Sequence, residues 1–202
     1  MVINLGLPKC QKRTHPPTYV TSIVSIKGLE VGFHGSPLLF IDDFHVNQGE
    51  ILAVTGPSGI GKTSLLRTIA GILRPISGTV DVCGARLPER PERGSIGYIP
   101  QKLGLVRHSS VWANVMLGSR AGNHRAESRE NAMSAIKDLG LEDKKNEPIK
   151  RLSGGQQRRV ATARTLAQRP ALILADEFLS ELDEETSEKV IHSVLEYVRS
   201  TK

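Results

Sequence analysis

Aromatic residues and cysteines are scarce in this chain of 202 residues, and long apolar runs are missing. Aromatic residues make up 4% of the sequence, and the two cysteines, Cys10 and Cys83, stand far apart and in no metal-ligand spacing. A disulfide framework is therefore disfavoured, and a reducing cytosol is the expected compartment. No apolar run approaches the roughly 18 to 20 residues that a helix needs to cross a bilayer, so a membrane role would have to come through a partner.

The rest of the composition is that of an ordinary globular chain. Hydrophobic residues make up 39% and charged residues 24%, which predicts one domain, or one domain with a subdomain. Residues 1–19 are expected to form a loose extension, because Pro8, Pro16 and Pro17 disfavour regular structure. This segment has no basic stretch ahead of an apolar core, which argues against a secretory signal.

Charge is distributed unevenly along the chain. The formal net charge is +6, but residues 1–175 hold 24 basic and 13 acidic groups, whereas residues 176–202 hold 3 and 8. A basic face could bind nucleic acid or anionic lipid. Without interleaved aromatics, a solvated surface that also favours anionic nucleotides is the better interpretation, so nucleic acid is not the expected partner.

A strand, a glycine loop and a helix are predicted between residues 51 and 73. The apolar run Ile51–Thr55 comes first, and apolar side chains then recur at helical spacing at Leu65, Leu66, Ile69, Ile72 and Leu73. The loop and the helix start consist of Gly56, Pro57, Ser58, Gly59, Ile60, Gly61, Lys62, Thr63 and Ser64. Glycines let the loop amides converge on phosphate oxygens, at the positive end of the helix dipole. Lys62 would bridge the outer phosphates and Thr63 would offer its hydroxyl to Mg²⁺, which is the P-loop or Walker A pattern; the alternative is a simple turn.

A second predicted strand ends in two acids. The apolar run 171–175 leads directly to Asp176 and Glu177. We expect Asp176 to hold Mg²⁺ through water, and Glu177 to accept a proton from the water that attacks the terminal phosphate. The alternative is that both acids only begin the acidic tail.

A second anion-binding helix start is predicted at residues 152–156. Ser153, Gly154, Gly155 and Gln156 open a helix whose small apolar face is formed by Val160, Ala161, Ala163 and Ala167 and which ends before Pro170. A serine hydroxyl, close backbone approach and a helix dipole suit a terminal phosphate. Since one chain then has two phosphate sites, two subunits are expected to face each other with ATP between them.

With this LSGGQ segment, the chain resembles the nucleotide-binding subunits of ABC transporters, from about Ser25 onward. The resemblance implies an α/β P-loop NTPase core with a mainly parallel sheet, an N-terminal antiparallel β-subdomain, and a helical subdomain at about 104–168 within a domain spanning 20–202. It implies an ATPase that energises transport through ATP-driven dimer closure. The implied partners are a separate permease, a second copy or a homologous ATPase subunit, and a solute-binding protein if the system imports. The implied location is the inner face of the cell membrane, reached through the permease.

The resemblance also assigns roles to single residues. Phe33 would stack on adenine, and Gln101 would contact Mg²⁺ or the attacking water. Asp183 would belong to a D-loop at residues 180–183. A packing aromatic and a polar loop residue remain the alternatives for Phe33 and Gln101. The helix expected over 125–139 would pack through Ala132, Met133, Ala135, Ile136 and Leu139, with Gly140 as its C-cap.

The chain also departs from the family pattern. The family places a histidine after the strand that follows the D-loop helix. Here the helix predicted over 184–199 is followed by only three residues, so the C-terminal strand region is expected to be truncated. His192 is expected to be a surface or flanking side chain of that helix, and Phe178 stands where the family usually has proline.

Two other functions stay open at this stage. One is a truncated nucleotide-binding module with little or no ATPase activity. The other is an ABC protein that acts on DNA or the ribosome, which is disfavoured because such relatives carry a long coiled-coil insertion or two cassettes, whereas Lys62 and Ser153 lie only 91 residues apart. The transported substrate and the direction of transport belong to partners outside this chain.

Overall fold

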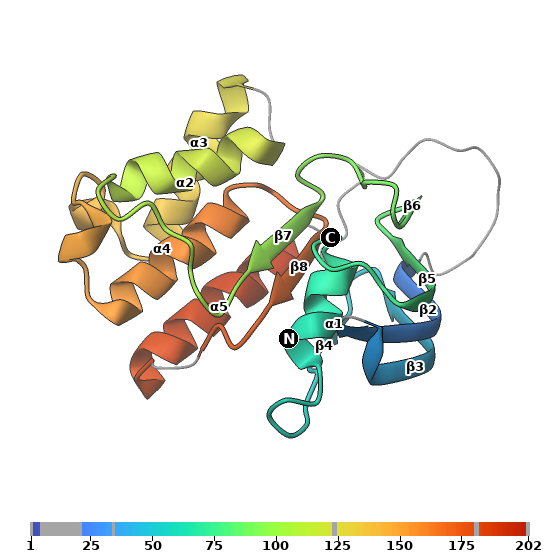
Figure 1. The fold of residues 1–202 in the computed structure, drawn as a ribbon. Helices are drawn as coiled ribbons and strands as arrows, with labels where there is room; N and C mark the ends of the chain where they lie inside the picture. The colour runs from blue at the N-terminus through green and yellow to red at the C-terminus, as the bar shows by residue number, and fades with distance from the viewer. Residues whose placement is uncertain (1, 5–21, 34, 123–124, 180–181, 201–202) are drawn as a thin grey trace.

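The computed structural model describes residues 2–4, 22–33, 35–122, 125–179 and 182–200, and it contains two β-sheets with helices around them (Figure 1). The first sheet has the strand order β4 (Ile51–Leu52), β1 (Val2–Asn4), β8 (Leu172–Ala175), β7 (Ile96–Ile99). The second has the order β3 (Ser36–Asn47), β2 (Ser22–Phe33), β5 (Ser77–Val82), β6 (Ala85–Arg86). The helices are α1 (Lys62–Ile69), α2 (Val111–Gly122), α3 (Arg125–Asp138), η2 (Glu142–Lys144), η3 (Ile149–Arg151), α4 (Gly154–Leu166) and α5 (Glu184–Ser200).

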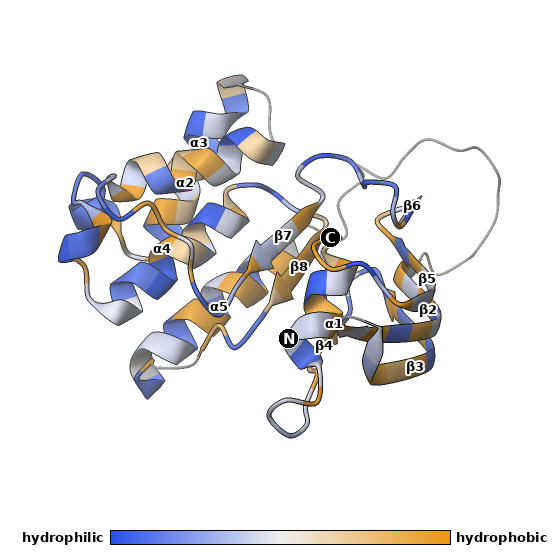
Figure 2. Ribbon diagram, in the orientation of Figure 1, coloured by the Kyte–Doolittle hydropathy of each residue, from blue (hydrophilic) through white to orange (hydrophobic). Residues whose placement is uncertain are grey.

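Strand β8 connects the two parts of the core. Ile173 and Ala175 pack in a cluster with residues of α2, α3, α4 and α5, whereas Leu172 and Leu174 pack in a second cluster with α1, β2 and β5. Successive side chains of a strand point to opposite faces, so a strand covered on both faces has to be apolar throughout. Figure 2 shows this as an uninterrupted orange β8. The acids that follow β8 are therefore held at the end of the most buried strand.

The α/β class and the antiparallel N-terminal sheet are confirmed, since β2 runs antiparallel to both β3 and β5. The first sheet is mixed rather than mainly parallel. Strand β7 pairs with β8 in parallel, but β1 is antiparallel to both β4 and β8.

The prediction of a loose extension over residues 1–19 is wrong at residues 2–4, which form strand β1. Val2 stands opposite Leu52 on one side and Leu174 on the other. The segment thereby supplies backbone hydrogen-bond partners to two strands at once, the buried β8 and the more exposed β4, and that demand outweighs the prolines further along the extension.

Two helices differ in detail from their predicted extent. Helix α1 ends at Ile69 rather than near Leu73, because Gly71 adopts a φ of +71° just beyond it; Ile72 is 62% exposed instead of packed. Helix α3 is followed by Gly140 at φ +59°, as predicted for its C-cap. Four of its predicted packing residues are buried, but Met133 is 38% exposed, so its assignment to the packing face is wrong.

The helices α2, α3 and α4 fall inside the range 104–168 predicted for a helical subdomain. Two glycines of α2 set its distance from α4. A Cβ at Gly118 would collide with the carbonyl of Arg164, and one at Gly122 with the carbonyl of Gln168. The absence of side chains at these positions allows α2 and α4 to pack closely against each other.

Candidate functional site

The glycine loop lies between β4 and α1, where its backbone is open to solvent. Gly59 and Gly61 have φ values of +84° and +105°, which glycine adopts without a Cβ penalty. Gly61 is the N-cap of α1, and its carbonyl accepts a hydrogen bond from the Leu65 amide at 2.8 Å. Residues 56–60 are exposed. The loop therefore presents accessible amides at the positive end of a helix, as an anion site requires.

Lys62 lies across the opening of this loop. Its Nζ donates to the carbonyl oxygens of Gly56 at 2.7 Å and Pro57 at 2.9 Å. The ammonium group is thus held beside the loop amides by two oxygen acceptors. Phosphate oxygens are stronger acceptors of the same kind, so the arrangement suits an exchange of partners.

Asp176 is the buried acid of the site, only 4% exposed. Its Oδ1 accepts a hydrogen bond from the Thr63 hydroxyl at 3.0 Å, and its Oδ2 accepts one from the Tyr98 hydroxyl at 3.3 Å. Burial raises the pKa of Tyr98, which keeps the phenol protonated as a donor. The role of Tyr98 was not predicted from the sequence; the signal available was its position three residues before Gln101.

The donor atoms around Asp176 fit Mg²⁺. The Thr63 hydroxyl and an Asp176 carboxylate oxygen are hard oxygen ligands that already lie 3.0 Å apart. In the part of the chain that the structure describes, no three or more His, Cys, Asp or Glu residues form a metal-binding group. Mg²⁺ is usually bound in proteins through one or two side chains together with nucleotide phosphates and water.

Glu177 and Gln101 form the second part of the site. The Gln101 amide Nε2 donates to Glu177 Oε2 at 2.6 Å. Glu177 has a φ of +47°, a conformation that costs energy for a residue with a Cβ and that is found disproportionately at functional sites. A cavity of about 340 Å³ is lined by Lys62, Asp176 and Glu177, together with Val54, Leu66, Ala175, Phe178 and Leu179.

Two arginines of α4 hold the segment that carries Gln101. Arg158, which is buried, donates to the Gln101 carbonyl at 3.3 Å. Arg164 donates to the carbonyls of Leu103 at 2.7 Å and Gly104 at 2.8 Å, and burial lowers its pKa. Neither arginine was singled out from the sequence. Both couple the position of the Gln101 loop to α4.

The segment Ser153–Gln156 lies elsewhere on the molecule. Ser153 caps α4: its hydroxyl accepts from the Gln156 amide at 3.2 Å, and the Gln156 side chain accepts from the Ser153 amide at 2.9 Å. Ser153 and Gly154 are exposed, whereas Gly155 faces Leu182 and Thr186. No hydrogen bond among the described residues joins this segment to the glycine loop, and Figure 1 draws β7, β8 and α5 between α1 and α4.

Phe33 and Ser64 are two further residues that were predicted to bind the nucleotide. Phe33 ends β2 and is 47% exposed, so its side chain is partly accessible. The hairpin of β2 and β3 flanks the glycine loop, since a Cβ at Gly61 would lie 3.2 Å from the Leu39 Cβ. Ser64 is buried in the first turn of α1, where its carbonyl accepts a hydrogen bond from Thr68.

Asp183 is the N-cap of α5. Its two carboxylate oxygens accept from the Thr186 amide and hydroxyl, both at 2.8 Å, and these bonds lower its pKa. Ser180 and Glu181, the first half of the predicted D-loop, lie outside the described residues. His192 is exposed and lies near Glu196, as expected for a surface side chain, and it lines a separate cavity with Arg159 and Lys189.

None of the helices in the described ranges is both long and apolar enough to span a bilayer. The family model described as ABC transporter matches residues 40–180.

Curated relatives and solved structures are similar over most of the chain. The L-cystine transport system ATP-binding protein TcyN of Escherichia coli is 36% identical over 86% of this chain and 74% of its own length. The phosphonates import ATP-binding protein PhnC 2 of Halalkalibacterium halodurans is 38% identical over 73% of this chain and 66% of its own length. The dimeric structure of the ATP-binding cassette MJ0796 with ADP and Pi, in a post-hydrolysis state, is similar with a TM-score of 0.75 and 29% identity, covering 89% of this chain and 84% of that one.

Proposed function

Since the chain belongs to the ABC transporter family of ATP-binding proteins, we propose that it binds ATP with Mg²⁺ and hydrolyses it to energise a separate membrane-spanning permease. The observation that supports this most directly is one cavity lined by Lys62, Asp176 and Glu177. Thr63 and Gln101 are hydrogen bonded to its two acids. The lysine proposed to bind phosphate and the acid proposed as general base therefore open onto the same space.

The proposed binding step uses the glycine loop and Lys62. The loop amides and the helix dipole would receive the β- and γ-phosphates, and Lys62 would exchange the carbonyls of Gly56 and Pro57 for phosphate oxygens. Mg²⁺, held by Thr63, Asp176 and the phosphates, would neutralise the charge that develops on the transferred phosphoryl group. Phe33 would stack on the adenine.

The proposed hydrolysis step uses Glu177 as general base. Its carboxylate would take a proton from the attacking water, and the Gln101 amide, 2.6 Å away, would orient that carboxylate. A positioned general base contributes about 10²- to 10⁴-fold in rate. The strained backbone of Glu177 fits such a role, because it fixes the carboxylate at the end of β8.

The proposed active form is a dimer. The exposed Ser153 and Gly154 lie outside the cavity of their own chain, so a second copy or a homologous subunit would bring its Ser153–Gln156 segment to the terminal phosphate. ATP binding would close the pair and hydrolysis would reopen it, at the inner face of the membrane and against the permease. PhnC 2 is named for import, which supports import here, with a solute-binding protein delivering the cargo.

A nucleotide-binding module with slow turnover is the second candidate. The family pattern has a histidine that contacts the terminal phosphate and helps to hold the general base. His192 does not take that place, because it lines a separate cavity with Arg159 and Lys189 and not the one with Glu177, and this favours slow turnover. The two candidates differ in turnover, not in nucleotide binding.

Mg²⁺-dependent phosphate release and nucleotide titration calorimetry test the proposal. We expect Glu177→Gln to lose at least about 100-fold in turnover while keeping ATP affinity, and to form an ATP-dependent dimer by light scattering. Lys62→Ala should lose binding. Glu196→Gln makes the same chemical change on the exposed face of α5 and should match the wild type.

Each outcome decides between the candidates. Nucleotide binding without release above background in the wild type would support the slow module. Wild-type turnover in Glu177→Gln would remove the assigned base, and absence of heat on titration of the wild type would overturn both candidates.

A further inference from the structure

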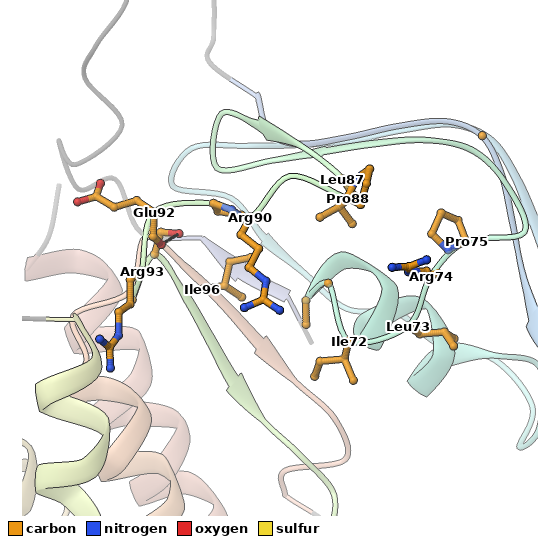
Figure 3. Close-up of a pocket in the computed structure, with 16 residues that line it drawn as sticks. Ile72, Leu73, Arg74, Pro75, Leu87, Pro88, Arg90, Glu92, Arg93 and Ile96 are labelled. Atoms are coloured by element: carbon orange, nitrogen blue, oxygen red, sulfur yellow. Dashed lines mark hydrogen bonds between the residues drawn. The ribbon is translucent and has the colours of Figure 1, made fainter.

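We propose that a cavity between the helices α3, α4 and α5 binds a small multivalent oxyanion, a compound with two or more carboxylate or phosphate charges. The cavity has a volume of about 720 Å³ and is lined by residues 137–140 at the end of α3, by Arg159 of α4, and by Glu188, Lys189, His192 and Ser193 of α5. It shares no lining residue with the cavity of Lys62 and Glu177, or with the one beside the end of α1 (Figure 3). Its volume lies in the range of about 300 to 1,000 Å³ that is usual for small-molecule pockets.

Basic side chains from three helices converge on this cavity. Lys137 comes from α3, Arg159 from α4 and Lys189 from α5, so each helix contributes one positive charge. Two acids, Asp138 and Glu188, also line the cavity and offset the three bases only in part. Gathering like charges costs free energy, and a bound anion removes that cost. The charge of the cavity therefore favours an anionic ligand.

Arg159 has one part of its guanidinium group anchored and another part without a partner. Its Nη1 donates to the carbonyls of Leu139 at 3.0 Å and Gly140 at 3.3 Å, just beyond α3. The Ser193 hydroxyl donates to the Asp138 carbonyl at 2.9 Å, so the negative end of the α3 dipole is already compensated by donors. The Arg159 Nε, in contrast, is buried and has no hydrogen-bond partner among the described residues. Such a donor calls for an acceptor, and carboxylate and phosphate oxygens are the strongest acceptors for a guanidinium group.

The remaining lining residues favour a compact hydrophilic ligand. Among the described residues that line the cavity, none is aromatic, so a nucleobase would find no stacking surface. Leu139, the large apolar side chain of the set, is 3% exposed, so an apolar segment would bury little surface there. His192 and Ser193 add polar groups. A small anion with several charges would contact the bases of all three helices at once, whereas a monovalent anion would neutralise only one of them.

The cavity lies between helices that also touch near the Ser153–Gln156 segment. Gly155 of α4 faces Leu182 and Thr186. An anion bound between Arg159 and Lys189 would link α4 to α5 a second time. It should therefore raise the thermal stability of the chain, because a ligand that binds only the folded state stabilises it. The binding requires no nucleotide, so its test is independent of the proposed ATPase function.

Isothermal titration calorimetry and thermal unfolding with citrate, inorganic phosphate and acetate, at constant ionic strength, test the proposal. All titrations use the full chain with Lys62→Ala, because the glycine loop is itself a proposed phosphate site. We expect saturable binding of citrate or phosphate with a Kd of about 1 mM or lower, and at least about tenfold weaker binding of acetate. The relative affinities of citrate and phosphate distinguish the two kinds of charged group. In this background, K137Q/K189Q should weaken binding at least about tenfold, and Arg159→Lys about threefold to tenfold.

The double variant K27Q/K150Q is the matched control, because it removes the same charges at two exposed lysines outside the cavity. It should bind citrate and phosphate as its parent does, and circular dichroism should show that all variants are folded. Equal loss in both double variants, or acetate bound as tightly as citrate and phosphate, would overturn the proposal. Absence of saturable binding to the Lys62→Ala chain would also overturn it, and would leave the proposed function untouched.

Discussion

The hydroxyl of Tyr98 lies 3.3 Å from Oδ2 of Asp176, on the carboxylate oxygen opposite the one that the Thr63 hydroxyl contacts at 3.0 Å. The two hydroxyls come from different elements, β7 and α1, while Asp176 follows β8. The rotation of the carboxylate is therefore fixed from both sides before any ligand arrives. Thr63 would have to share its hydroxyl with Mg²⁺, but Tyr98 could keep its bond throughout the proposed cycle.

This arrangement predicts that the Tyr98 hydroxyl positions Asp176 for Mg²⁺ binding. We expect Tyr98→Phe to leave ATP affinity nearly unchanged but to raise the Mg²⁺ concentration needed for half-maximal phosphate release about threefold to tenfold, consistent with the loss of about 1 kcal/mol from a long hydrogen bond to a charged group. Tyr197→Phe removes a hydroxyl from α5 and should leave the Mg²⁺ dependence as it is. Equal Mg²⁺ dependence in all three proteins would show that Tyr98 does not position Asp176.

Arg164 predicts a second effect at a distance from the reacting atoms. Its guanidinium binds the carbonyls of Leu103 and Gly104, just beyond Gln101. We expect Arg164→Met to destabilise the fold by about 1 to 3 kcal/mol in urea unfolding, because the half-buried carbonyl of Leu103 and the exposed carbonyl of Gly104 lose their charged donor. Turnover should fall more than ATP affinity, since the Gln101 loop would no longer hold Glu177 in place. Arg164→Lys restores one donor and should recover part of the loss; full activity in the methionine variant would contradict this role.

The parts of the site that are formed by residues adjacent in the sequence could be predicted from the local sequence pattern. The glycine loop, the helix that follows it and the buried strand before Asp176 are each defined by a short stretch of sequence, and all three elements are present in the predicted order. The extent of α1 was overestimated because the apolar spacing continues through Ile72, whereas the positive φ of Gly71 ends the helix.

Contacts between distant segments could not be predicted in this way. Tyr98, Arg158 and Arg164 contribute to the site because the fold brings β7, α4 and the Gln101 loop together. The hydrophobic periodicity of the sequence does not indicate these contacts. The pairing of Val2–Asn4 between β4 and β8 is of the same kind. A strand of three residues carries almost no local signal, and its place is decided by which neighbouring strands lack partners.

The core around β8 makes a third prediction. Ile173 is fully buried, and its removal would leave a cavity between the sheet and the helices. We expect Ile173→Ala to lower the free energy of unfolding by about 2 to 5 kcal/mol, measured by urea titration. Ile72→Ala deletes the same atoms from a side chain that is 62% exposed and should change stability by less than about 0.5 kcal/mol. Similar losses in both variants would contradict the central position of β8.

The hydrogen bonds of Asp183 predict how the stability of the fold depends on pH. Because hydrogen bonds from Thr186 lower its pKa in the folded state, the charged carboxylate stabilises the fold. That contribution is complete above the ordinary Asp pKa of about 3.9 and is lost as the pH falls through the lower folded value. We expect Asp183→Asn to be less stable than the wild type at neutral pH and the difference to shrink as the pH falls below about 4, in urea titrations at each pH. Thr186→Val keeps the backbone donor and removes the hydroxyl, so its pH dependence should lie between those of the wild type and the asparagine variant. A stability difference between wild type and Asp183→Asn that stays constant from neutral to acid pH would show that the carboxylate charge contributes nothing to the cap of α5.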